Sequence, residues 1–169
     1  MTPSPFVLAH LGAAPSGPAL DVACGTGRHA VAIGRTGRRV EAIDRDVTRC
    51  RALAVRARLE RLPIEVVCAD LDDFPLAAVR YAVVVNTLFL VRALVPPLVR
   101  ALRPGGLLLF ETFTVAQLAT GHPRNPAFAL EPGELPRLAR GLEVLAYREG
   151  AVERDGNVIH LASLAARAT

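Results

Sequence analysis

The stretch that decides the fold is Ala19-Leu20-Asp21-Val22-Ala23-Cys24-Gly25-Thr26-Gly27-Arg28-His29-Ala30. It begins with a short apolar run that is typical of a buried strand, and it continues into a helical pattern that ends near Gly34. Gly25 and Gly27 can take positive φ angles and let the backbone approach a ligand without a Cβ in the way. The stretch therefore predicts a ligand-binding loop between a strand and a helix.

Apolar runs and helical patterns alternate on both sides of this loop, which is the signature of β-α-β units and a mainly parallel sheet. The last two runs are joined by Arg154-Asp155-Gly156-Asn157, a hairpin turn signal that predicts an antiparallel pair. We expect one α/β domain over residues 1–169, with a doubly wound, Rossmann-like sheet of about seven strands. The expected strands are 19–23, 39–43, 64–69, 79–85, 107–110, 142–149 and 157–166, and the expected helices are 5–11, 25–34, 47–62, 90–102 and 135–140.

The composition excludes several classes of enzyme. All 20 of the residues counted as lysine or arginine are arginine, so the lysine of a P-loop, of a Schiff-base enzyme or of a protein kinase is missing. Aromatic residues make up 5% of the chain and tryptophan is absent, which argues against base stacking and nucleic-acid binding despite the net charge of +4. The three cysteines form no CxxC pair, so neither a disulfide framework nor a metal site is expected.

The location of the protein is predicted from two further stretches. Residues 1–5 lack the basic segment and apolar run of a signal peptide, and the most apolar stretch, 81–91, is too short and too polar to span a bilayer. We therefore expect a cytoplasmic protein with no membrane partner. The sequence predicts no particular oligomeric state.

Carboxylates stand at the expected ends of three successive strands, where ligands of doubly wound sheets bind. Asp21 ends the first strand and suits a cation, while Asp44 ends the second, where a carboxylate can accept both hydroxyls of a ribose. Asp70 ends the third strand and can accept from an adenine amino group, beside the backbone N–H of Leu71. Together they describe a nucleoside with a cationic amino-acid tail, namely S-adenosylmethionine.

A dinucleotide is the alternative ligand, because Gly25-x-Gly27-x-x-Ala30 also matches a dinucleotide fingerprint. Asp21 argues against it, since a negative charge would then lie beside the pyrophosphate. The chain is also too short for a second domain that brings a substrate to a nicotinamide.

The sequence resembles the class I S-adenosylmethionine-dependent methyltransferases in the glycine-loop block, Asp44, Cys68-Ala69-Asp70 and Leu102-Arg103-Pro104-Gly105-Gly106-Leu107. Within this class it is similar to small methyltransferases related to the tellurite-resistance family, in residues 128–135 and 155–159. The resemblance implies the strand order 3-2-1-4-5-7-6 with strand 7 antiparallel. It also implies S-adenosylmethionine as the cofactor, with Asp21 and the Gly25–Gly27 loop at the methionine end. The expected cofactor residues are Asp21, Ala23, Gly25, Gly27, Asp44, Arg45, Asp70, Leu71 and Asn86.

The fourth strand is followed by Asn86-Thr87-Leu88-Phe89 and not by the Asn/Asp-Pro-Pro-aromatic motif of amine-methylating relatives. A small-molecule acceptor is therefore expected, and the cationic composition favours an anionic one, with residues 114–130 closing over it. The expected acceptor-side arginines are Arg28, Arg92 and Arg124. The expected catalytic residues are Glu111, as a general base or else as a cap of the following turn, His122 and Arg124. His29 is expected on the surface of its helix, with a place in the pocket wall as the alternative.

Two other functions are compatible with the sequence. One is a nucleic-acid or protein methyltransferase. The other is a cofactor-binding module without catalysis, because only about a dozen residues precede the first turn and the usual cover over the cofactor is reduced.

Overall fold

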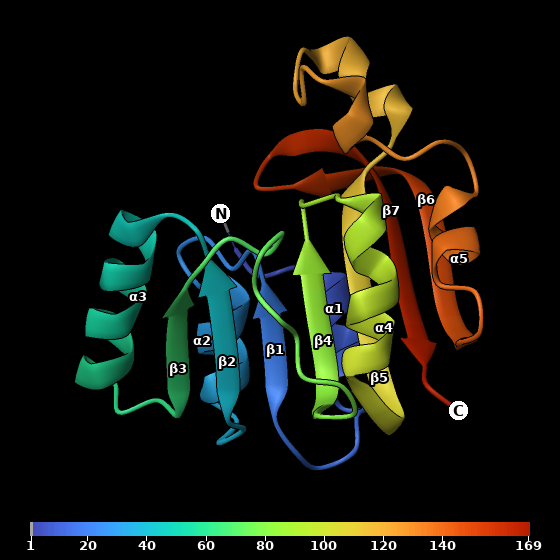
Figure 1. Ribbon diagram of the computed structural model, residues 1–169. Helices are drawn as coiled ribbons and strands as arrows, with labels where there is room; N and C mark the ends of the chain where they lie inside the picture. The colour runs from blue at the N-terminus through green and yellow to red at the C-terminus, as the bar shows by residue number, and fades with distance from the viewer. Residues whose placement is uncertain (1) are drawn as a thin grey trace.

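A computed structural model describes residues 2–169, which contain one seven-stranded sheet in the order β3-β2-β1-β4-β5-β7-β6 (Figure 1). Neighbouring strands are parallel except for β7, which runs antiparallel to both β5 and β6, so the expected topology is confirmed. The strands are β1 (Ala19–Val22), β2 (Val40–Asp44), β3 (Ile64–Cys68), β4 (Tyr81–Thr87), β5 (Leu102–Phe113), β6 (Glu143–Arg154) and β7 (Asn157–Arg167).

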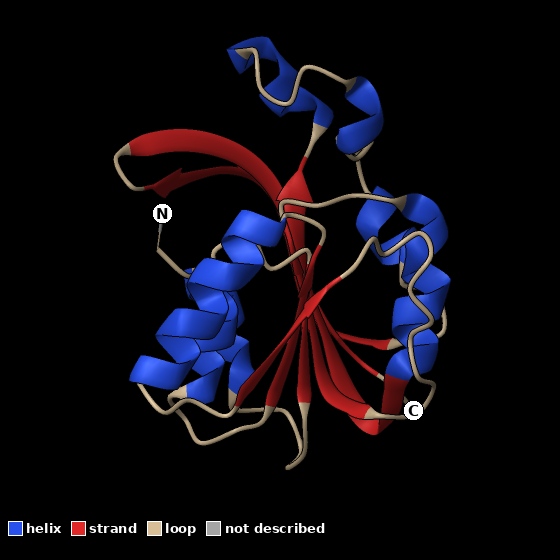
Figure 2. Ribbon diagram, turned by 60° about the vertical axis from the view of Figure 1, so that its left-hand side comes forward, coloured by secondary structure: helices blue, strands red, loops and turns tan. Residues whose placement is uncertain are grey.

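Helices cover both faces of the sheet (Figure 2). One face packs against α1, α2 and α3 through a core that includes Val7, Ile33 and Leu53, and the other packs against α4 and α5 through residues such as Leu98 and Leu135. The helices are α1 (Pro5–Leu11), α2 (Arg28–Gly34), α3 (Val47–Leu59), α4 (Val95–Ala101) and α5 (Glu134–Leu138), with short 3₁₀ turns η1 (Arg92–Leu94), η2 (Val115–Thr120) and η3 (Pro126–Phe128).

Side-chain caps and prolines set where these helices begin. The Asp46 carboxylate accepts hydrogen bonds from the backbone N–H groups of Thr48 and Arg49 and so starts α3. The helix expected over 90–102 is split into η1 and α4, because Pro96 and Pro97 are tolerated in the first turn of a helix and not inside it.

Strand β5 begins earlier than the sequence predicts. The turn expected at 103–106 lies inside it as a bulge, where the pairing with β4 shifts between Tyr81 and Val83. Gly105 has a φ of +74°, and a Cβ on Gly106 would lie 2.9 Å from the carbonyl oxygen of Tyr81. Only glycines let the two strands come together here.

Two extensions of the chain lie beyond the carboxyl ends of the parallel strands. Residues 114–130 form a separate lobe above β5, closed at its base by a bridge between Thr114 and Leu130 (Figure 1). The β6–β7 hairpin arches over the face that carries α1 and α2 (Figure 2). In residues 2–169 no helix combines the length and the apolar character needed to cross a bilayer.

Candidate functional site

A cavity of about 410 Å³ lies at the carboxyl ends of the first four strands. Another cavity, of about 420 Å³, lies at their amino ends beside Pro18 and Tyr81, so volume alone does not identify a functional site. The position of the first cavity identifies it as the candidate site, because ligands of doubly wound sheets bind at the carboxyl ends of the strands. The carboxyl-end cavity is lined by Ala23, Asp44, Arg45, Arg49, Ala69, Asp70, Leu71, Asp72, Leu88, Phe89, Val91 and Phe128.

The glycine loop between β1 and α2 lies beside this cavity and contributes Ala23 to its lining, whereas Gly25 and Gly27 lie outside the lining. Ala23, Gly25 and Gly27 all have positive φ, at 48°, 56° and 73°. A Cβ on Gly27 would lie 2.3 Å from Cδ1 of Leu53, so α3 requires a glycine at that position. A Cβ on Gly25 would meet nothing closer than 3.9 Å, so the space above Gly25 is open to a ligand.

Asp44 ties the glycine loop to the end of β2. Its Oδ2 accepts a hydrogen bond from the Gly25 N–H at 2.7 Å, and its Oδ1 accepts one from the Asp46 N–H at 2.9 Å. The residue is 8% exposed and its carboxylate lines the cavity. Each carboxylate oxygen has a second lone pair, so Asp44 can accept further hydrogen bonds from a ligand.

Asp21 lies under the loop and outside the set of residues that line the cavity. It is 1% exposed, and its Oδ2 accepts a hydrogen bond from the Ala30 N–H at 2.9 Å. Burial raises the pKa of this carboxyl group to about 7, although the Ala30 N–H and the charge of Arg28 oppose the rise. A cation bound above the loop would favour the ionised form, so Asp21 is suited to respond to a positively charged ligand.

Asp70 and Leu71 form the far wall of the cavity, as the sequence places them. Asp70 makes a 3.7 Å ion pair with Arg45, and both side chains are largely exposed, so this pair adds little stability. The Leu71 side chain is buried and joins the core around β1 and β2. The Leu71 N–H donates to no acceptor within residues 2–169, which leaves it available to a ligand.

Asn86 shapes the wall that follows β4. Its Nδ2 donates to the carbonyl oxygen of Phe89 at 2.9 Å, which holds the turn where Leu88 takes a φ of +56°. Within the described residues its Oδ1 is buried and has no hydrogen-bond partner. An unpartnered buried acceptor next to a cavity wall is a place where a donor on a ligand gains a hydrogen bond.

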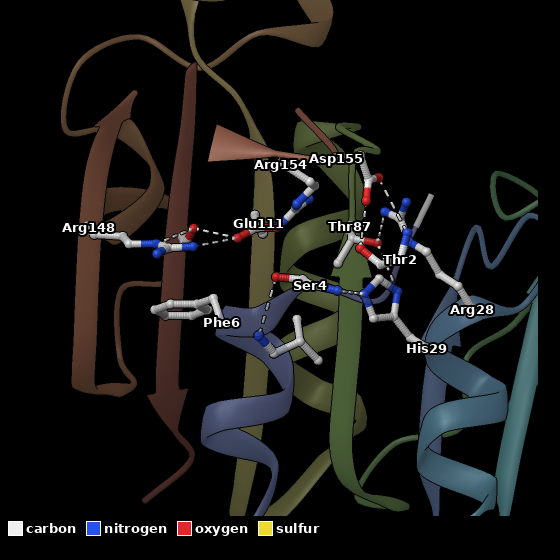
Figure 3. Close-up of polar contacts among 12 residues, drawn as sticks. Thr2, Ser4, Phe6, Arg28, His29, Thr87, Glu111, Arg148, Arg154 and Asp155 are labelled. Atoms are coloured by element: carbon white, nitrogen blue, oxygen red, sulfur yellow. Dashed lines mark hydrogen bonds and ion pairs between the residues drawn. The ribbon is translucent and has the colours of Figure 1, made fainter. Parts of the chain in front are cut away.

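Glu111 lies on the other face of the sheet, in a polar cluster under the hairpin (Figure 3). Its side chain is fully buried and accepts hydrogen bonds from Arg154, from Arg148 at 3.3 Å and from the Ser163 hydroxyl at 2.7 Å. Burial alone would raise its pKa, but the bonds from Arg154 and Ser163 outweigh it and hold the pKa below its usual range. Glu111 also lies outside the cavity lining, so the expectation of a general base is corrected to that of a buried ion-pair partner.

His29 belongs to the same cluster and is 2% exposed, so its expected surface position is wrong. Burial, and then the charge of Arg28, lower its pKa to about 3, which keeps the ring neutral. Nε2 accepts a hydrogen bond from the Ser4 N–H at 2.9 Å, so the proton resides on Nδ1, 3.3 Å from Oγ1 of Thr87. No sequence signal marked this residue, because its partner Ser4 is 25 residues away.

The lobe formed by residues 114–130 brings Phe128 to the cavity, but not the two residues that the sequence favours. His122 and Arg124 are exposed and lie outside the cavity lining. The His122 ring packs edge-on against Phe113, with ring centroids 5.4 Å apart. The structure therefore does not bring the expected catalytic residues Glu111, His122 and Arg124 together.

The guanidinium group of Arg92, which the sequence predicts on the side of the methyl acceptor, is held by other residues of the chain. Its Nε and Nη2 donate to the Glu134 carboxylate at 2.6 and 2.9 Å, and its remaining hydrogen bonds go to the carbonyl oxygens of Ala127 and Ala129. It fastens the end of the lobe to η1. Among residues 2–169 no three histidine, cysteine, aspartate or glutamate side chains are grouped to hold a metal ion.

Comparisons with known proteins agree with this geometry. The methyltransferase domain family matches residues 19–106, which is more than half of the chain. A comparison with curated proteins gave no match. TehB from Haemophilus influenzae has a TM-score of 0.81 and 22% identity, over 97% of this chain and 61% of the TehB chain, so this chain spans about three fifths of TehB.

Two further solved structures share the fold. A S-adenosylmethionine-dependent methyltransferase from Methanosarcina mazei has a TM-score of 0.79 and 18% identity, over 99% of both chains. Geranyl diphosphate C-methyltransferase from Streptomyces coelicolor, solved with Mg²⁺, geranyl diphosphate and S-adenosylhomocysteine, has a TM-score of 0.76 and 18% identity, over 97% of this chain and 77% of that one. Because the family model matches more than half of the chain, the chain belongs to the methyltransferase domain family, and the solved structures share its fold.

Proposed function

We propose that this protein transfers the methyl group of S-adenosylmethionine to a small anionic acceptor in the cytoplasm. The observation that carries the proposal is the Asp44 carboxylate, which braces Gly25 and lines an open cavity at the strand ends. That arrangement supplies acceptors for a ribose directly beside a loop that admits close approach of a ligand.

The residues around the cavity fit the cofactor in size and in chemistry. A volume of about 410 Å³ lies within the range typical of small-molecule sites. Asp44 would hold the ribose, and Asp70 with the Leu71 N–H would hold the adenine. The buried, unpartnered Oδ1 of Asn86 and the raised pKa of Asp21 favour a cationic group beside the glycine loop. When bound, S-adenosylmethionine supplies a methyl group already activated by its sulfonium.

The chain's own contribution is positioning and exclusion of water. Glu111 is committed to Arg154 and Ser163, and the pKa of His29 is too low for proton transfer near neutral pH. The proposal therefore assigns no general base and relies on holding two reactants in line in a partly dry site. Phe128, Phe89 and Leu88 supply the apolar wall that excludes water.

A small acceptor is supported by the shape of the site and by the sequence after β4. The cavity is bounded by the turn at Leu88 and Phe89 and by Phe128 of the lobe. The motif of amine-methylating relatives is missing at Asn86. The Streptomyces enzyme was solved with a small anionic substrate, geranyl diphosphate, in the same fold.

A mass-spectrometric screen with isotopically labelled cofactor tests the proposal. The protein is incubated with labelled S-adenosylmethionine and separate pools of small acids, small amines, peptides and nucleic acids. We expect label in the pool of small acids only. Label in peptides or nucleic acids would replace the small acceptor with a macromolecule, and cofactor binding without labelling of any pool would support the non-catalytic module.

A further inference from the structure

The polar cluster under the hairpin contains a buried cation with an unused donor. Arg154, the last residue of β6, is 5% exposed and donates from Nη2 to the buried Glu111 carboxylate. Among residues 2–169 its Nη1 is buried and has no hydrogen-bond partner. Buried donors are nearly always paired, so an orphaned guanidinium nitrogen indicates a place for an acceptor.

A second arginine reaches the same cluster without a direct ion pair to a carboxylate. Arg28, the first residue of α2, is half-buried, and within residues 2–169 its side chain makes one hydrogen bond, a 3.4 Å contact from Nη2 to Oγ1 of Thr87. No carboxylate of the described chain lies within 4.0 Å of it, whereas Arg148 and Arg154 both reach Glu111. Burial, and then the positive charge of Arg154, lower the pKa of Arg28, so the two guanidinium groups repel each other. Figure 3 shows them entering the cluster from opposite sides.

We propose that Arg28 and Arg154 together bind the anionic group of the methyl acceptor. The inference rests on the proposed function and specifies where the acceptor lies. An oxyanion between the two guanidinium groups would remove their repulsion and give Nη1 of Arg154 its missing acceptor. A carboxylate or a phosphate meets this requirement, because both present several oxygens to arginine.

The cluster is placed correctly for an acceptor. Thr87, which contacts Arg28 and His29, is followed directly by Leu88, which lines the cofactor cavity. Arg28 itself follows the glycine loop that ends at Gly27. An acceptor whose anionic group lies at Arg28 therefore extends over one strand end into the cavity where the methyl group is held.

Access to the cluster requires the contacts between the N-terminal segment and the hairpin to open. The N-terminal segment closes it through Thr2, whose N–H and hydroxyl donate to the Asp155 carboxylate at 3.4 and 3.0 Å. Both contacts are exposed, so they break at low cost in comparison with core contacts. The neutral ring of His29 adds no negative charge, and the carboxylates of Asp21, Glu111 and Asp155 act on Arg28 from beyond ion-pair distance.

Calorimetric titration of the protein loaded with S-adenosylhomocysteine tests this inference, with inorganic phosphate and acetate as probes and chloride to keep the ionic strength constant. Loading fills the cofactor site, so the probes report on the acceptor side. We expect wild type to bind phosphate, acetate or both, and the stronger probe identifies the class of anion. Arg28→Gln should weaken that binding at least tenfold, while Arg51→Gln, which changes an exposed arginine of α3, should leave it unchanged.

Arg28→Gln is used because Arg154→Gln would leave Glu111 buried without its partner and could unfold the protein. Without added anion, Arg28→Gln should melt close to the wild-type temperature, because loss of the repulsion from Arg154 offsets loss of the attraction to Asp21, Glu111 and Asp155. Unchanged anion affinity in Arg28→Gln, no anion binding by wild type, or a melting temperature lowered by several degrees would overturn the proposal. Failure to bind S-adenosylhomocysteine would instead reject the proposed function, and the same titration of the unloaded protein would still decide the arginine site.

Discussion

The carboxylate of Asp44, at the end of β2, accepts a 2.7 Å hydrogen bond from the backbone N–H of Gly25. One side chain therefore fixes the conformation of the glycine loop and presents the same carboxylate to the cavity. The link explains how a strand end 19 residues away in sequence sets the shape of the loop that we propose to lie beside the cofactor.

Replacement of Asp44 by alanine should weaken the binding of S-adenosylhomocysteine by tens- to hundredfold. The change removes charge-assisted hydrogen bonds to the ribose and the brace on Gly25, and such a loss costs on the order of 2–3 kcal/mol. Asp46→Ala is the matched control, because it removes the cap of α3 and should lower stability by about 1 kcal/mol without changing affinity. Calorimetry and thermal melting separate the two effects, and wild-type affinity in Asp44→Ala would show that Asp44 does not hold the ribose.

Replacement of Asp21 by asparagine should stabilise the ligand-free protein at pH 8. The pKa of Asp21 is raised to about 7 by burial, so at pH 8 the folded protein must hold a buried charge that the unfolded chain leaves in water. Asp21→Asn removes this cost, which is up to about 4 kcal/mol, and should weaken the binding of S-adenosylmethionine. Asp73→Asn, at an exposed carboxylate, should change neither quantity in denaturant titrations and calorimetry. A destabilised Asp21→Asn protein would mean that the carboxylate is needed by the fold.

His29 should make the protein sensitive to acid. Its pKa is about 3 in the folded state and near 6.5 in the unfolded state, so its contribution is complete above pH 6.5 and is lost as the pH falls toward 3. Asp21 has the opposite effect on stability. The free energy that its buried charge costs the folded protein at pH 8 is recovered as the pH falls from about 7 toward 3.8. Asp21→Asn should therefore lose stability between pH 6.5 and 4 by about 1.4 kcal/mol per pH unit, more steeply than wild type.

The control for this pH dependence is His29→Gln, whose stability should fall less than that of wild type over the same interval. Urea titrations at several pH values give the slopes. Equal slopes for wild type and both variants would contradict the assignment of a neutral His29 and a protonated Asp21.

Arg92→Ala should loosen the lobe formed by residues 114–130. Arg92 donates to Glu134 and to the carbonyl oxygens of Ala127 and Ala129, and loss of these bonds should cost about 1–3 kcal/mol. Limited proteolysis should then cleave the lobe faster, while Arg100→Ala, at an exposed arginine of α4, should be cleaved at the wild-type rate. An unchanged cleavage pattern in Arg92→Ala would mean that Phe113 and the bridge at Thr114 hold the lobe without it.

The sheet could be predicted from the sequence because its signals are local. The glycine loop, the apolar runs and the turn at Asp155-Gly156 each mark one element, and the resemblance to the family orders them. The early start of β5 could not be predicted, because a bulge at Gly105 depends on pairing with Tyr81 on another strand.

The polar cluster around Glu111 was harder to predict because its contacts join distant residues. Glu111 is 43 residues from Arg154 and 52 from Ser163, and neither pairing leaves a periodic pattern in the sequence. In the sequence, a strand-end carboxylate that contacts a ligand looks the same as one that pairs with a buried arginine. The N-terminal segment that buries His29 also carries no motif that predicts the contact from Ser4.

The central claim is that the strand-end cavity binds S-adenosylmethionine. It is tested most directly by isothermal calorimetry of the wild-type protein with S-adenosylhomocysteine and, in separate titrations, with NAD and NADP. The site predicts a one-to-one complex with S-adenosylhomocysteine and no heat from either dinucleotide, because Asp21 and Asp44 favour a cationic nucleoside over a pyrophosphate. Tight binding of NAD or NADP with no heat from S-adenosylhomocysteine would contradict the account.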